Sequence, residues 1–134
     1  MQNRLSTVGR IVFALPFLLF GASHFLKGEA KAAVVPIPGG VFWVYLTGAA
    51  MIAASLGIMT KILGKWAALG LALLMAIFVV FVHVPELSSS QMEEMATMNL
   101  LKDIALCGAA LSWAGILARE EATRDVRSST PAHA

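Results

Sequence analysis

Six polar side chains interrupt otherwise apolar parts of the 134-residue chain. This polar set is His24, His83, Glu86, Asn99, Lys102 and Asp103. An ionisable group inside a lipid bilayer is costly, so each member is a candidate functional residue. Imidazoles, amines and carboxylates held together can donate and accept protons, and burial shifts their pKa values. The set therefore indicates acid–base chemistry.

Three members of the polar set share one helix face, because Asn99, Lys102 and Asp103 are spaced i, i+3 and i+4. We expect that face to turn inward, since the alternative exposes a charge to lipid. In the predicted site, Lys102 and His24 donate to oxygens of a ligand while Asp103 relays or balances a proton. Asn99 orients the ligand. The catalytic candidates are His24, Lys102 and Asp103, and the ligand-binding candidates are Asn99, His83 and Glu86.

Each of these residues also has a purely structural interpretation. Lys102 can extend to the outer headgroups, with Asp103 as its solvated neighbour. His24 can satisfy a helix end, and His83 with Glu86 can terminate another helix. The convergence of the whole polar set on one side of the membrane favours the functional interpretation.

Composition excludes several classes of protein. Hydrophobic residues make up 58% of the chain and charged residues only 13%, about half the usual share in soluble domains. So few charges do not cover the surface of a small soluble enzyme, and the chain is too apolar to be disordered. The net charge is +2 and the basic residues are scattered singly, so no nucleic-acid partner is expected.

Four apolar segments approach the roughly 20 residues that cross a hydrocarbon core. The first follows Arg4 and Arg10 and has an alternative interpretation as a secretory signal. The fourth reaches full length if Ser90 and Glu93 form a capping box at its start. We predict helices over approximately 8–26, 41–59, 66–84 and 90–118, followed by a polar cytoplasmic tail over 119–134.

The distribution of basic residues predicts the topology. Seven Lys and Arg flank one side of the predicted spans and three flank the other, which places both termini in the cytoplasm. The seven are Arg4, Arg10, Lys61, Lys65, Arg119, Arg124 and Arg127, and the three are Lys27, Lys31 and Lys102. The fold prediction is an all-α, integral membrane, four-helix antiparallel bundle in the cell membrane of a bacterium.

Small residues predict which faces of the helices pack. Ala49, Ala53 and Gly57 recur at spacing four in the second segment, and Gly108 and Ser112 do so in the fourth. Such spacing lets helix backbones approach closely in lipid. We expect these faces to be buried in the bundle.

Sulfur-containing residues carry weaker signals. The single cysteine, Cys107, excludes an intrachain disulfide and is expected to fill apolar space. Met92, Met95 and Met98 are spaced three apart, a pattern that suits monovalent copper but also suits a flexible apolar surface. We expect no metal site.

Several short motifs resemble the DoxX family of small four-helix membrane proteins. They occur in the same order as in the family and at matching places relative to the four apolar segments. They are Gly9-Arg10-Ile11, Phe20-Gly21-Ala22-Ser23-His24-Phe25, Val35-Pro36, Leu46-Thr47-Gly48 and Asn99-Leu100-Leu101-Lys102-Asp103-Ile104-Ala105-Leu106. The resemblance implies a four-helix bundle with a polar pocket toward the outer leaflet. Members of the family have been linked to quinone-coupled oxidation of sulfur compounds such as thiosulfate and to resistance against quinones, catechols and thiol stress.

One position departs from the family pattern. Many DoxX-like chains carry a glutamate three residues after the glycine of the second helix, and Met51 stands there in this chain. Family chemistry that requires a carboxylate on this helix is therefore not expected. His24, Asn99, Lys102 and Asp103 match family positions, whereas His83 and Glu86 are nominated by their placement alone.

The leading functional hypothesis is a quinone-linked oxidoreductase, or a subunit of one, that binds a quinone or small aromatic ligand near the outer leaflet. Membrane lipid and a protein subunit are the other expected partners. A second hypothesis is a non-catalytic scaffold or assembly subunit whose polar set is a satisfied structural network. A small exporter is disfavoured because the polar residues cluster near one surface rather than at the bilayer midplane.

Overall fold

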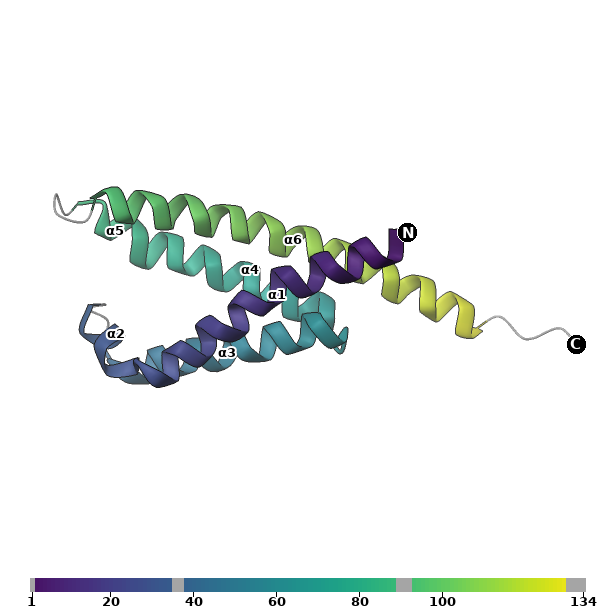
Figure 1. The fold of residues 1–134 in the computed structure, drawn as a ribbon, viewed down its shortest axis with the longest axis horizontal. Helices are drawn as coiled ribbons and strands as arrows, with labels where there is room; N and C mark the ends of the chain where they lie inside the picture. The colour runs from purple at the N-terminus through teal and green to yellow at the C-terminus, as the bar shows by residue number, and fades with distance from the viewer. Residues whose placement is uncertain (1, 35–37, 89–92, 130–134) are drawn as a thin grey trace, which may run out of the picture.

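The protein is helical throughout the part of the chain described by the computed structural model, which comprises residues 2–34, 38–88 and 93–129. Its elements are α1 (Gln2–Leu26), α2 (Gly28–Val34), α3 (Val41–Thr60), α4 (Gly64–Phe78), the π-helix η1 (Val79–His83), α5 (Val84–Glu86) and α6 (Glu93–Ser129) (Figure 1). The all-α prediction is confirmed, because these residues include no strand.

Within the same residues, four helical stretches are long and apolar enough to cross a membrane, as expected of a multi-pass membrane protein. They are Arg4–Leu26, Val41–Thr60, Gly64–Glu86 and Glu93–Ser129. The first begins before the predicted boundary, and the fourth continues as helix beyond residue 118. Ser90 of the predicted capping box and the Val35-Pro36 motif lie outside the described residues.

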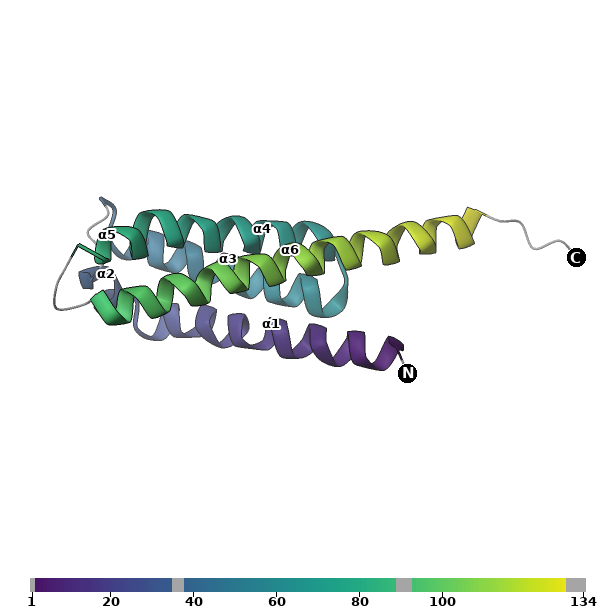
Figure 2. The ribbon, with the colours of Figure 1, turned by 90° about the horizontal axis from the view of Figure 1, so that it is seen from above.

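The four long helices form two closely packed pairs. α1 packs along α3 and α4 packs along α6, while α3 also contacts α4. The pairs diverge toward the end of the molecule that carries α2 and α5, whereas the N-terminus and the α3–α4 turn lie toward the other end (Figures 1 and 2). Between them the core is filled by large side chains such as Phe17, Ile58, Leu71 and Met75.

Two glycines allow the close contact between α1 and α3. A Cβ added at Gly48 would lie 2.6 Å from the Cβ of His24 and 3.0 Å from the carbonyl oxygen of Gly21. Farther along the same contact, the Ser55 hydroxyl donates a 2.7 Å hydrogen bond to the Ala14 carbonyl oxygen. The glycine contact holds His24 directly against α3.

The predicted small-residue faces of α3 and α6 are wrong at most of their positions, although Gly57 packs closely against Ala67 of α4. Ala49 and Ala53 are exposed, as are Gly108 and Ser112. The buried face of α3 instead comprises Val44, Gly48, Met51, Ser55 and Ile58. Because α3 is apolar on all sides, its composition does not specify which side meets α1.

Two salt bridges connect α6 to the α3–α4 region just beyond residue 118. Lys61 Nζ lies 2.6 Å from Glu120 Oε2, and Lys65 Nζ lies 3.0 Å from Glu121 Oε2. These contacts join the α3–α4 turn to the last part of α6. All four side chains are partly exposed, so each pair contributes about 0–1 kcal/mol to stability.

The glycine contact yields a stability prediction. We expect Gly48→Ala to lower stability by about 1–3 kcal/mol, because the new methyl group overlaps His24 and Gly21. Thermal unfolding of the detergent-solubilised protein measures the change. Gly115→Ala is the matched control, since nothing lies within 4 Å of the added Cβ there and alanine favours a helix. Equal thermal midpoints for the two variants would contradict the assigned contact.

Candidate functional site

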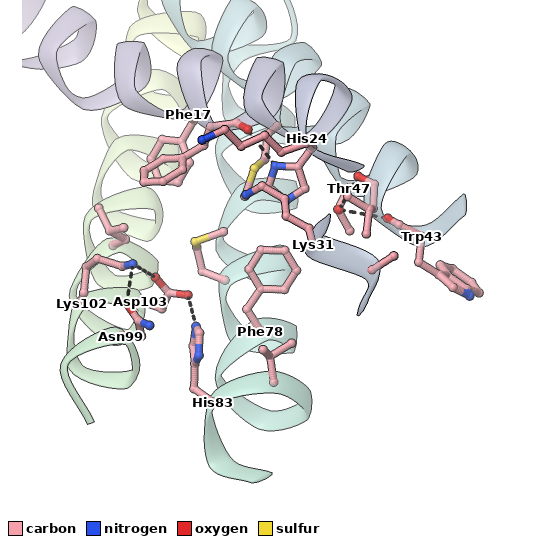
Figure 3. A pocket seen from close by; sticks show the side chains of 18 of the residues that line it. Phe17, His24, Lys31, Trp43, Thr47, Phe78, His83, Asn99, Lys102 and Asp103 are labelled. Carbon is pink, nitrogen blue, oxygen red and sulfur yellow. Dashed lines mark hydrogen bonds and ion pairs between the residues drawn. The ribbon is translucent and has the colours of Figure 1, made fainter. Parts of the chain in front are cut away.

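A cavity of about 470 Å³ lies between the two helix pairs, beside α2 (Figure 3). Its volume is within the usual range for sites that bind small organic molecules. Its lining includes large aromatic and sulfur-containing side chains, namely Phe17, Phe20, Trp43, Met51, Met75 and Phe78. We call this cavity the pocket.

The polar set meets at the pocket. Five of its members line the pocket, namely His24, His83, Asn99, Lys102 and Asp103. Glu86 does not line the pocket but contacts His83. Residues from three separate helical spans are therefore brought to one place (Figure 3).

His83 lies between two carboxylates. Its Nε2 is 3.0 Å from Asp103 Oδ2, and its Nδ1 is 3.1 Å from Glu86 Oε2. Asp103 is buried and His83 is nearly so, whereas Glu86 is more exposed. A neutral imidazole can donate from only one nitrogen, so the trio contains either an imidazolium or a protonated carboxyl group. Glu86, His83 and Asp103 thus form a hydrogen-bonded trio that ends at the pocket.

The π-helix η1 places His83 in this trio. Pro85 has no N–H group, and its ring is incompatible with an ordinary helical hydrogen bond in the preceding turn. The turn widens instead, and the Val84 N–H donates to the Val79 carbonyl oxygen five residues earlier. Phe78 and His83, also five residues apart, therefore both line the pocket. Such π-turns occur often at functional sites.

Lys102 is held on the opposite side of the pocket from α2 (Figure 3). Its Nζ donates a 3.2 Å hydrogen bond to Asn99 Oδ1 and lies 3.7 Å from Asp103 Oδ1. The same ammonium group is 5.9 Å from the centroid of the Phe20 ring, within the range of a cation–π contact. The Lys102 side chain is half-exposed, and its amine is held by contacts with Asn99, Asp103 and Phe20.

His24 has one ring nitrogen available to a ligand. Its Nδ1 is 2.7 Å from the Phe20 carbonyl oxygen, and because that oxygen only accepts, Nδ1 carries the proton. In the neutral ring Nε2 then bears a lone pair. His24 is therefore suited to accept a proton at Nε2 from a molecule in the pocket.

The pocket is also lined by Lys27 and Lys31, which are not among the site residues that the sequence predicts. Helical hydrogen bonds continue across the α1–α2 junction, from the Lys27 N–H to the Ser23 carbonyl and from the Lys31 N–H to the Lys27 carbonyl. His24, Lys27 and Lys31 thus lie on one face at i, i+3 and i+7, and that spacing could have identified them. Burial, with the nearby charge of Lys27, lowers the pKa of Lys31.

Other sequence expectations fall outside the pocket. Cys107 is half-buried, and its thiol lies 3.4 Å from the Ala72 carbonyl oxygen. Met95 and Met98 are exposed, and Met92 lies outside the described residues. In the part of the chain that the structure describes, no group of three His, Cys, Asp or Glu is arranged to hold a metal ion.

Comparisons of the chain with protein-family models, curated proteins and solved structures found no match. The function is therefore argued from the geometry of the pocket and from the chemistry of its residues.

Coupling between His83 and Asp103 can be measured with a double-mutant cycle. We expect His83→Gln and Asp103→Asn together to destabilise the protein by about 1–3 kcal/mol less than the sum of the single changes, because each single change leaves a partner unpaired. Equilibrium unfolding in mixed micelles gives the four free energies.

The exposed pair Lys61 and Glu120 is the control for this cycle, using Lys61→Gln and Glu120→Gln. Its coupling is expected to stay below about 1 kcal/mol. If the changes at His83 and Asp103 are additive, the buried contact does not link α4 to α6 in solution.

Proposed function

We propose that this chain is a DoxX-like membrane protein that binds a quinone-like or small aromatic molecule in the pocket and acts as, or within, a quinone-linked oxidoreductase. The observation that carries this proposal is the pocket itself, in which aromatic walls adjoin the hydrogen-bonded trio of Glu86, His83 and Asp103. Flat, apolar molecules that exchange protons fit both properties. The sequence motifs around His24 and Asn99 to Asp103 support the family assignment.

The proposed topology is an antiparallel bundle with both termini in the cytoplasm. The excess of Lys and Arg at the N-terminus, the α3–α4 turn and the C-terminal part supports this orientation. It puts the pocket toward the outer leaflet of a bacterial cell membrane. A ligand dissolved in the bilayer could then enter between the diverging helix pairs.

A bound quinone would supply reversible redox chemistry, taking up electrons and protons in equal number as it is reduced to a quinol. In this proposal the electrons come from a reduced sulfur compound, which is oxidised by a partner subunit. Lys102 donates a hydrogen bond to an oxygen of the ligand and stabilises negative charge there. Asn99 orients Lys102 through their 3.2 Å hydrogen bond.

Protons move through the imidazoles and carboxylates. His24 exchanges a proton at Nε2, the nitrogen not used by the Phe20 carbonyl. On the other side of the pocket, Asp103 exchanges a proton with His83, and His83 exchanges one with the more exposed Glu86. The trio connects the pocket with the water beyond the end of α5 and the start of α6.

Ligand retention is the direct test of this function. We expect an organic extract of the wild-type protein, purified in mild detergent, to contain a near-stoichiometric quinone or related aromatic molecule by mass spectrometry. His24→Ala and Lys102→Ala should each reduce it by about tenfold or more, because each removes a polar contact to the ligand. Leu101→Ala, at an exposed position outside the pocket, is the control.

The alternative of a non-catalytic scaffold makes the opposite prediction for the same samples. The satisfied contacts within the trio favour this alternative as the second candidate. Only bulk lipid would be recovered from every variant, while His24→Ala and Lys102→Ala lower the yield of folded protein. That result would reject the quinone proposal.

Topology is tested by labelling with a membrane-impermeant maleimide in intact cells. Cys107 is first changed to Ser, and single cysteines are then introduced by Glu29→Cys and Arg124→Cys. We expect labelling of intact cells only for Glu29→Cys, and labelling of both after lysis. Labelling of Arg124→Cys in intact cells would invert the proposed orientation.

A further inference from the structure

The pocket has an excess of positive charge. Lys27, Lys31 and Lys102 all line it, whereas Asp103 is the only acidic lining residue in the described ranges 2–34, 38–88 and 93–129. The Asp103 carboxylate is already engaged by His83 and by Lys102. It is therefore not available to balance the two remaining lysines.

Lys27 and Lys31 have no anionic partner. Among the described residues neither side chain forms an ion pair or a hydrogen bond. Glu29 is close in sequence but does not line the pocket and forms no ion pair there either. Instead, Lys31 interacts electrostatically with Lys27 and lies beside His24 (Figure 3).

The fold holds these two like charges on one surface. The helical hydrogen bonds across the α1–α2 junction keep His24, Lys27 and Lys31 on the same face. α2 is also packed against α3, and the Gly28 backbone lies against the Tyr45 ring in a space that a Cβ would fill. The lysines are thus presented to the pocket by ordered helix, and their repulsion is relieved when an anion binds between them.

Apolar side chains also line the pocket, and Phe17, Met51, Met75 and Phe78 are among them. A molecule that fills the pocket therefore meets the two lysines as well as hydrocarbon and aromatic surface.

We infer that the natural ligand is an amphipathic anion, with one acidic group held by Lys27 and Lys31 and an apolar or aromatic body between the helix pairs. This inference rests on the proposed function, because it names the chemical class of the ligand in the same pocket. An acidic quinone is consistent with both the proposed function and this inference. A neutral quinone is consistent with the proposed function alone.

A matched pair of probes tests the inference. The anionic probe is a 3-alkyl-2-hydroxy-1,4-naphthoquinone, which is deprotonated at neutral pH, and the neutral probe is its 2-methoxy ether. Dodecanoate is an anion that is not a quinone. Native mass spectrometry of the full-length protein released from detergent micelles counts each bound probe as its concentration is raised.

We expect the anionic naphthoquinone to bind the wild type about tenfold or more tightly than its methyl ether, because a charge-assisted contact is gained. The combined variant Lys27→Gln and Lys31→Gln should remove that preference without weakening the neutral probe. Lys31→Glu should reverse it. Lys65→Gln, which removes a lysine paired with Glu121 outside the pocket, should leave the preference unchanged.

The outcomes separate the inference from the proposed function. Equal binding of the two naphthoquinones overturns the inference and leaves the quinone proposal standing. Lysine-dependent binding of dodecanoate, without binding of either naphthoquinone, supports the inference and overturns the quinone proposal. Binding of no probe overturns both.

Lipid headgroups are the remaining source of an acidic group near α2. Phosphatidylglycerol is therefore titrated in the same way. If only this lipid shows a dependence on Lys27 and Lys31, the two lysines contact headgroups at the membrane surface and the inference is wrong.

Discussion

Asp103 is a buried carboxylate in a helix that is apolar enough to cross a membrane, and a charge in that position requires a partner. His83 provides the partner from the neighbouring helix, and Glu86 contacts its other nitrogen. His83 reaches Asp103 because the helix widens before Pro85. The widened turn also keeps Phe78 on the pocket side. The contact between His83 and Asp103 and one wall of the pocket thus follow from the same local distortion.

The second wall depends on a different interaction. Gly21 and Gly48 allow α1 and α3 to touch along their backbones, and this contact fixes His24 against α3. Each helix pair is tightly packed within itself, so the space in the molecule lies between the pairs. The pocket therefore has two halves, one bearing His24 and Lys31 and the other bearing Asp103. A ligand that contacts both halves links them.

Much of the architecture is encoded in simple patterns. The long uncharged segments predict the membrane-spanning helices, and the cost of exposing charge to lipid predicts that His24, Lys102 and Asp103 come together. The buried face of α3 could not be predicted, because Ala49 and Met51 are both compatible with lipid and with packing, and only the position of α1 selects between them. The π-turn could not be predicted from the sequence either, since a proline such as Pro85 can equally end a helix.

The length of α6 has a mechanical consequence. Its 37 residues span about 55 Å, whereas the hydrocarbon core of a bilayer is about 30 Å thick. Asp103 lies toward one end of this helix, and the other end extends past the rest of the protein (Figure 2). For a rigid rod, displacement grows with distance from the pivot. A tilt of α6 about its contacts with α4 would therefore move the region near Ser129 farther than it moves the pocket wall.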